Sequence, residues 1–124
     1  LVYGLWQARE SAEAIVVEAE IDVLSFAQAG YSAIAVGGAH MSREQADLIK
    51  RSRIERLYLG GDNDEQGRKM NKQIKRLLGG HVELFKVDYG RYKDANEALL
   101  GGMENIPSII ENGKRLYLCN KVVI

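Results

Sequence analysis

The sequence has little of several residue types, and each shortage excludes a class of protein. Among its 124 residues Cys119 is the one cysteine, so neither a disulfide framework nor a cysteine-based zinc site can form within the chain. Pro107 is the one proline, and 46% of the residues are apolar, as in a folded globular chain rather than a disordered one. The length predicts a single domain with its own core. A lone thiol suits a reducing compartment, so we expect a cytoplasmic location.

Strong net charge and long hydrophobic runs are absent as well. The 17 basic residues balance the 17 acidic ones, so net charge gives no support to a free-standing nucleic-acid binder, although a basic face can still exist. No apolar run reaches the ~20 residues that a membrane-spanning helix needs, and no signal peptide is visible, so we expect no membrane association. The chain begins with Leu1 rather than methionine, and we expect it to belong to a larger protein.

Common nucleotide and metal motifs are also missing. Neither a Walker-type Gly-Lys-Ser/Thr sequence nor a GxGxxG sequence occurs. The segment "DNDEQG" opens like a calcium-binding loop, but Gln66 stands at its fifth position and Gln73 at its twelfth, where such loops have Asp or Asn and then Glu. His40 and His81 are far apart and have no companion at metal-binding spacing.

Short apolar runs alternate with amphipathic stretches, which predicts alternating strands and helices. The expected strands are 14–17, 33–36, 57–59 and 82–87, and the expected helices are 21–29, 42–49, 64–78, 95–100 and 107–112. Ser42 and Gln45 form a capping-box pattern, and Gly37 and Gly38 are expected to close the second strand. Short links favour an α/β domain with a mainly parallel sheet of about four strands and helices on both faces. The tail 115–124 is expected to form a hairpin, an edge strand or the start of a following domain.

Acidic residues follow several of the expected strands. Glu18 comes directly after the first strand, Asp62 and Asp64 come after the third, and Asp94 lies a short distance beyond the fourth. Open α/β sheets bind ligands outside the carboxyl ends of their strands, so we expect these carboxylates to converge. Converging carboxylates repel unless a cation lies between them, which predicts a hard divalent ion, Mg²⁺ first, with phosphate as co-ligand. Nearby glycines such as Gly67 would let another group come close.

Each of these acidic residues also has an ordinary explanation at a helix start. Asp64 can cap the helix that follows it, Asp94 can do the same for "ANEALL", and Glu18 can be a solvated residue. Three such residues would then have to fall on one edge of the sheet by chance, which favours a site.

A run of basic residues lies on the expected helix 64–78. Such a run is usually the solvated face of an amphipathic helix. Arg68 is one turn from Asp64, and Lys93 directly precedes Asp94, so these two cations are candidates for contact with a phosphate or a carboxylate. The run comprises Arg68, Lys69, Lys72, Lys75 and Arg76.

Taken together, these segments resemble the toprim domain, a metal-binding module of bacterial-type primases, topoisomerases, some nucleases and recombination-mediator proteins. That family has a Glu after its first strand, which Glu18 matches, and an Asp-x-Asp after its third, which Asp62 and Asp64 match. "VVEAEIDVLSFAQAG" and "DNDEQGRK" resemble primase segments, and "KDANEALL" is similar to a stretch of phage primase-helicases and the mitochondrial helicase Twinkle. Ala19 stands where the family usually has glycine, and a methyl there could crowd a close backbone approach.

The resemblance implies a toprim, Rossmann-like fold over residues 13–101. Residues 1–12 would be a connector from a preceding subdomain, and 102–124 a C-terminal extension of helix and strand. The implied function is that of a DNA primase, which transfers nucleotides to a growing RNA primer. Its partners would be a DNA template, NTPs, the RNA primer and a replicative helicase in cis or in trans, at the nucleoid or replisome.

The same resemblance gives roles to individual residues. Glu18, Asp62 and Asp64 would be catalytic, and together with Asp94 they would bind Mg²⁺ or Mn²⁺. Glu18 would be a metal ligand or a general base. Asp22 and Gly67 would support the site without binding metal.

Two other functions fit the same fold. One is a metal-dependent nuclease or a topoisomerase, the latter with a catalytic tyrosine in another domain. The other is a non-catalytic module that docks onto a replication assembly or binds nucleic acid.

Overall fold

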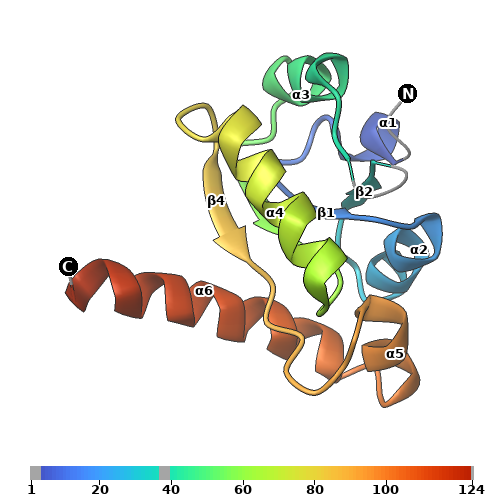
Figure 1. Ribbon diagram of the computed structural model, residues 1–124. Helices are drawn as coiled ribbons and strands as arrows, with labels where there is room; N and C mark the ends of the chain where they lie inside the picture. Colours follow the sequence, from blue (N-terminus) through green and yellow to red (C-terminus); the bar gives the residue numbers. More distant parts are fainter. Residues whose placement is uncertain (1–3, 37–39, 124) are drawn as a thin grey trace.

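The computed structural model describes residues 4–36 and 40–123, which form a three-layer α/β domain (Figure 1). In this part of the chain the sheet has four strands in the order β2 (Ala33–Ala35), β1 (Glu13–Val17), β3 (Arg56–Leu59) and β4 (Glu83–Lys86). Every neighbouring pair is parallel, with Ile15 opposite Ala33 on one side and Tyr58 on the other. The predicted α/β class and parallel sheet are therefore confirmed.

Helices cover both faces of this sheet, as predicted. The helices are α1 (Leu5–Ala8), α2 (Glu20–Gln28), α3 (Arg43–Lys50), α4 (Glu65–Leu78), α5 (Ala95–Leu100) and α6 (Asn105–Val123). Alternate side chains of a strand point to opposite faces. Val16 thus packs in one core with α1, α3 and α4, whereas Ile15 and Val17 pack in a second core with α2, α5 and α6. Figure 1 shows α4 across one face and α6 beside β4.

Local sequence explains where the helices begin. Ser42 accepts a hydrogen bond from the Gln45 N–H at 3.1 Å while the Gln45 side chain accepts one from the Ser42 N–H at 2.8 Å, so the predicted capping box is confirmed.

In α4 the residues at helical spacing, Met70, Ile74 and Leu78, are fully buried. Their spacing turns one face of α4 toward the sheet and leaves its charged face outside.

The C-terminal tail differs from expectation. A hairpin or strand was expected after residue 114, but α6 runs on to Val123, and the expected last residue, Ile124, lies outside the described residues. A two-stranded hairpin is marginal by itself, whereas lengthening an existing helix adds one backbone hydrogen bond per residue without a new nucleation cost. The glycines expected to close the second strand, Gly37 and Gly38, lie outside the described residues.

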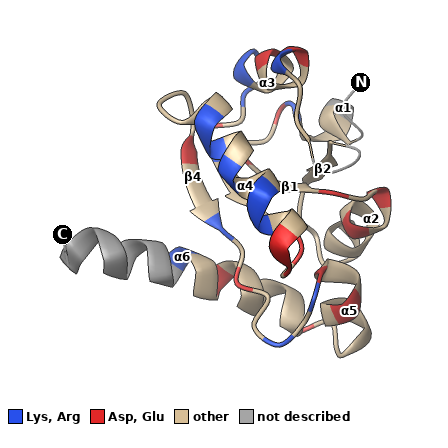
Figure 2. Cartoon of the chain, viewed as in Figure 1, with Lys and Arg blue, Asp and Glu red and all other residues tan. Residues whose placement is uncertain are grey.

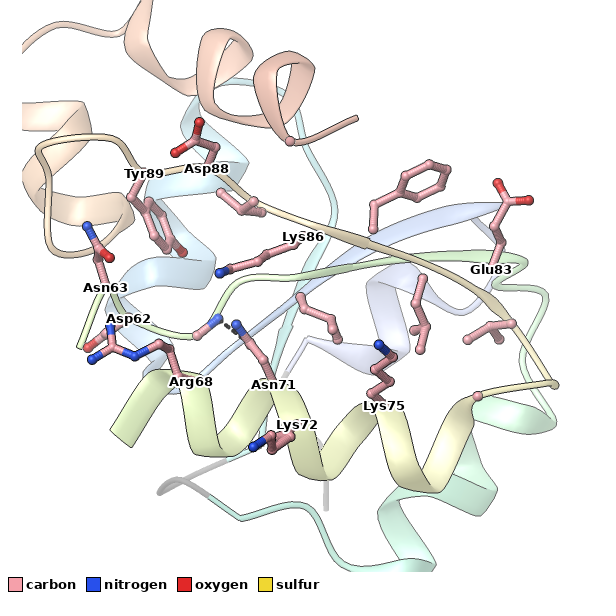
Figure 3. A pocket seen from close by; sticks show the side chains of 18 of the residues that line it. Asp62, Asn63, Arg68, Asn71, Lys72, Lys75, Glu83, Lys86, Asp88 and Tyr89 are labelled. Atoms are coloured by element: carbon pink, nitrogen blue, oxygen red, sulfur yellow. Dashed lines mark hydrogen bonds between the residues drawn. The ribbon is translucent and has the colours of Figure 1, made fainter. Parts of the chain in front are cut away.

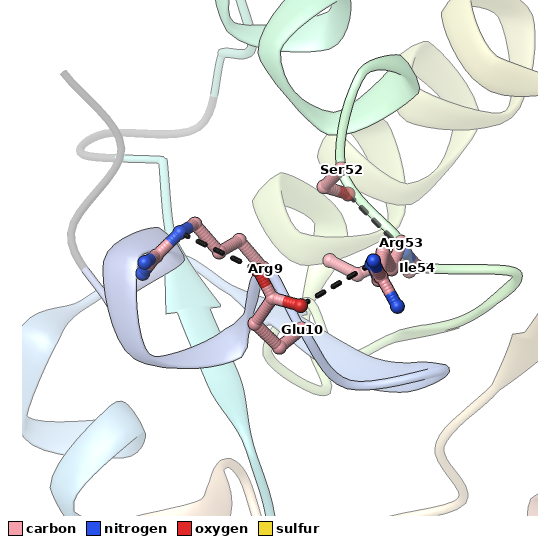
Figure 4. A network of polar contacts seen from close by, with 5 residues as sticks. All are labelled: Arg9, Glu10, Ser52, Arg53 and Ile54. Carbon is pink, nitrogen blue, oxygen red and sulfur yellow. Dashed lines mark hydrogen bonds and ion pairs between the residues drawn. The ribbon is translucent and has the colours of Figure 1, made fainter.

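The N-terminal segment is tied to the connection between α3 and β3 (Figure 4). The Arg53 N–H donates to the Arg9 carbonyl at 2.9 Å, and the Arg53 guanidinium lies 3.2 Å from the Glu10 carboxylate. Ala8 is buried in the same core as residues of α3 and α4. Residues 4–12 therefore pack as part of this domain.

Candidate metal centre

The carboxyl ends of β1 and β3 bring Glu18 and Asp62 together. The two strands are direct neighbours, and each acidic residue lies just beyond its strand. The Asp62 N–H donates to Glu18 Oε2 at 3.4 Å, although the residues are 44 positions apart. The predicted convergence at this edge of the sheet is thus observed for the central pair.

Hydrogen bonds from Asn63 join the loop of this pair to the loop that carries Asp94. Asn63, between the two aspartates of the Asp-x-Asp segment, donates its N–H to the Lys93 carbonyl at 2.6 Å. Its side chain also donates to the carbonyls of Gly90 at 2.9 Å and Tyr92 at 3.2 Å. These bonds hold the loop that carries Asp94 against the loop that carries Asp62. Asn63 was not predicted from the sequence, because its partners are about thirty positions away.

Asp22 lies beneath these loops and is almost fully buried, with 2% of its surface exposed. Its Oδ1 accepts a hydrogen bond from the Asn96 N–H at 3.2 Å, which joins the start of α2 to the start of α5. Burial, followed by the charge of Asp94, raises the pKa of Asp22 to about 6 against the lowering effect of the Asn96 bond. This position fits the supporting role expected of Asp22.

Asp62 is the most perturbed group of the cluster. Burial raises its pKa to about 8, and the hydrogen bond shared with Glu18 and the charges of Glu18, Asp22 and Asp94 act in the same direction. Among the described residues its Oδ1 is a buried side-chain oxygen with no hydrogen-bond partner. A buried, unpaired carboxylate oxygen surrounded by further carboxylates is chemically suited to a hard cation, which would satisfy the oxygen and offset the repulsion.

Asp64 and Asp94 are helix caps, as their alternative explanation predicted. Asp64 Oδ1 accepts the Gly67 N–H at 2.8 Å at the start of α4, and Asp94 Oδ1 accepts the Glu97 N–H at 2.8 Å at the start of α5. A cap uses one oxygen of a carboxylate, so capping and metal binding are compatible. Over residues 4–36 and 40–123 no three His, Cys, Asp or Glu side chains already form a metal-holding group. Mg²⁺ keeps several waters and rarely needs such an all-protein cage.

Two glycines allow α4 to approach the Asp62 loop. A methyl at Gly67 would overlap the backbone of Asp62, and a methyl at Gly61 would overlap the Gly67 carbonyl. The Gly61 N–H donates to Oδ1 of the buried Asn71 at 3.0 Å. Gly67 therefore lets α4 lie directly against the Asp62 loop, and Asn71 adds a bond that was not predicted from the sequence. The sequence feature that could have pointed to Asn71 is its position next to the apolar Met70, on the inward side of α4.

Tyr89 also supports this loop, and it too was not predicted from the sequence. Its buried hydroxyl donates to the Gly60 carbonyl at 2.6 Å. Burial raises the pKa of Tyr89 well above its usual value, and the charges of Asp22, Asp62 and the other acidic residues raise it further. The hydroxyl therefore stays protonated and keeps donating its hydrogen bond.

Ala19 does not disturb this arrangement. It is exposed, and its φ of −121° and ψ of 150° are ordinary extended values for the residue before α2. The backbone at Ala19 is therefore not in a left-handed conformation that calls for glycine. Crowding of a bound group by this methyl stays a prediction.

The two cations predicted to contact phosphate occupy different places. Arg68 is exposed and lines a groove of about 920 Å³ that begins at Asp62 and lies between α4 and β4. Lys93 is exposed on the loop held by Asn63, outside the groove lining. Figure 2 shows acidic residues at the starts of α2, α4 and α5, and basic residues along the rest of α4.

A parallel sheet in this strand order, with acidic residues past β1, β3 and β4, defines the class of toprim-type domains. The chain belongs to the Toprim-like family, whose model matches residues 15–99. It is 32% identical over 108 residues to a DNA primase of Deinococcus radiodurans, a match that covers 82% of this chain and 19% of that protein.

Solved structures agree with this assignment. The Aquifex aeolicus primase (zinc-binding and RNA polymerase domains) superposes with a TM-score of 0.75 at 28% identity, over 90% of this chain and 29% of that one. The primase fragment of the bacteriophage T7 primase-helicase has the same fold, with a TM-score of 0.64 at 24% identity, over 88% of this chain and 48% of that one. The chain thus spans about a fifth of the Deinococcus relative. No helix among the described residues is long and apolar enough to cross a membrane.

Proposed function

We propose that this chain is the metal-binding catalytic domain of a DNA primase. The observation that carries the proposal is the acidic edge of the sheet, where Asp62 has a buried, unpaired oxygen and a pKa of about 8. The DNA primases that the chain resembles support the reaction class, which is nucleotidyl transfer to an RNA primer.

The proposal gives a role to each acidic residue. Asp62, Asp64 and Asp94 would hold Mg²⁺ or Mn²⁺ directly or through water, and Glu18 would be a further ligand or the general base. The ion, when bound, neutralises phosphate charge and stabilises the attacking and leaving oxygens. Glu18 is close to the Asp62 backbone, because its Oε2 accepts the Asp62 N–H at 3.4 Å.

Other groups would position or bind the substrate rather than react. Asp22 would fix the starts of α2 and α5 relative to each other, since it accepts the Asn96 N–H. Arg68 at the groove and Lys93 beside Asp94 would contact phosphates. The partners would be a DNA template, NTPs, the RNA primer and a replicative helicase, in the cytoplasm at the nucleoid or replisome.

The metal role can be tested on the chain itself. Mn²⁺ binding is measured by electron paramagnetic resonance for the unaltered chain and for Asp62→Asn, Asp64→Asn and Asp47→Asn. Asp47 is exposed on α3, so its replacement is a matched control for the loss of one carboxylate. We expect the first two variants to lose at least tenfold in affinity and the control to lose none. Equal binding by Asp62→Asn and the control would refute the metal role.

The reaction is tested in the longer protein that carries this chain. Primer synthesis from NTPs on single-stranded DNA should fall at least a hundredfold in Asp62→Asn and remain unchanged in Asp47→Asn. If Asp62→Asn lowers Mn²⁺ binding but the unaltered protein makes no primers, the site binds metal for another reaction. A nuclease assay on the same protein would then identify that alternative.

A further inference from the structure

The groove beside the acidic edge is lined by basic residues from two elements. Arg68, Lys72 and Lys75 come from α4, and Lys86 comes from β4 on the opposite wall. Figure 3 shows Arg68 and Lys75 along α4, with Lys86 directed from β4 toward that helix. The groove exists because α4 covers the inner strands of the sheet and leaves one side of β4 open.

The position of these cations on the helix is selective. Successive α-helical residues turn by about 100°, so positions 68, 72 and 75 fall within roughly 60° of one another. Lys69 and Arg76 lie roughly 40–60° beyond Lys72 around the helix, and neither is part of the groove lining. The run of five basic residues in the sequence therefore divides into three that face the groove and two that do not.

The groove cations are available to bind a ligand. All four are exposed, and none forms an ion pair with another described residue, whereas Lys69 is paired with Glu65 at 3.7 Å. Acidic residues also line the groove: Asp62 at one end, Glu83 at the other, and Asp88, whose Oδ1 accepts the Gly90 N–H. The middle of the groove is consequently its most positive part.

The shape suits a chain of phosphates rather than a single anion. From position 68 to position 75 the helix rises about 10 Å, which is about three nucleotide steps at the ~3.4 Å rise of a stacked strand. Sites for a single phosphate group or a triphosphate usually gather their donors at one point, such as a helix N-terminus or a nest of backbone N–H groups. Here the cations are strung out, and apolar side chains such as Val82 and Leu84 lie between the walls.

We propose that this groove, defined by Arg68, Lys72, Lys75 and Lys86, binds the sugar–phosphate backbone of one nucleic-acid strand that enters or leaves the acidic edge. The strand would pass Asp62 and run along α4, with its phosphates facing the groove cations. The proposal rests on the proposed function only for the identity of the strand as template or primer.

The test compares two double variants of equal charge. Lys72→Gln with Lys75→Gln removes two groove cations, and Lys69→Gln with Arg76→Gln removes two cations from the same helix outside the groove. Binding of a labelled oligothymidylate is followed by fluorescence anisotropy over a range of salt concentrations. A single strand gives a log–log salt slope of about −0.7 per phosphate contact, so we expect the groove variant to lose about 1.4 in slope and the control almost nothing. Equal losses in the two variants would overturn the proposal, as would no binding by the unaltered chain.

Two further measurements make the result specific. Tripolyphosphate is added as a competitor, and displacement at concentrations as low as those of the oligonucleotide would assign the groove to triphosphates instead of a strand. Mn²⁺ binding is measured for the groove variant and should match that of the unaltered chain. Failure of the metal role would appear in that titration with Asp62→Asn, whereas failure of the groove would appear only in the anisotropy data.

Discussion

Replacing Asp62 by asparagine should stabilise the domain when no divalent ion is added, even though it should abolish metal binding. The Asp62 carboxyl group has a pKa of about 8 in the folded chain and 3.8 when it is unperturbed, so the folded state favours its neutral form. As pH rises from about 4 to about 8, the folded state must hold a proton that the unfolded state releases. Stability is therefore lost over this interval, and an uncharged amide of the same shape avoids the loss.

The size of the effect is limited by exposure to water. At about 1.4 kcal/mol per pKa unit, the full difference between the two pKa values of Asp62 would correspond to a loss of between about 5 and 6 kcal/mol in the free energy of unfolding. Asp62 is only half-buried, so water screens its neighbours and we expect about 1–2 kcal/mol at pH 8. For a domain of this size that is roughly 4–8 °C in Tm.

The measurement is thermal unfolding in EDTA at pH 5 and pH 8, with Asp47→Asn as the control. Asp62→Asn should exceed the unaltered chain in Tm at pH 8 and gain less at pH 5, whereas the control should track the unaltered chain at both values. Added Mg²⁺ should raise the Tm of the unaltered chain and leave that of Asp62→Asn unchanged. A lower Tm for Asp62→Asn at pH 8 would refute the reasoning, because it would mean that the charged carboxylate stabilises the fold.

Three other substitutions test how the loops are held. Gly67→Ala should destabilise the fold by about 3 kcal/mol in urea unfolding, because the overlap with the Asp62 backbone outweighs the ~1 kcal/mol helix-propensity gain; a more stable variant would show that α4 can move away. Asn71→Ala should cost about 1–3 kcal/mol in the same assay, because it leaves the buried Gly61 N–H unpaired; an unchanged midpoint would mean that water replaces the side chain. Ser42→Ala removes the capping box and should lower the free energy of unfolding by about 1 kcal/mol without changing Mn²⁺ binding. Weaker Mn²⁺ binding by this variant would show that Ser42 acts on the metal site.

Much of the architecture was predictable because it depends on local patterns. Short apolar runs predicted the strands, and the amphipathic stretches between them predicted the helices. The positions of Glu18, Asp62 and Asp64 just beyond strand ends predicted an acidic edge of the sheet. Caps were readable for the same reason, since Asp94 needs only the three residues that follow it. A helix was predicted at 107–112, but its continuation to Val123 was not, because apolar residues in a short stretch fit a strand and a helix equally well.

Sequence alone thus determined the class of domain and the residues most suited to a cation, because strand ends and helix starts are properties of neighbouring residues. Only the tertiary structure decided how those residues act together. The strand order placed Asp62 against Glu18, and the bonds of Asn63 brought in the loop of Asp94. Packing of α4 on the sheet selected which of its cations, Lys72 among them, face a groove. Such contacts join segments tens of residues apart, and no local pattern encodes which segments meet.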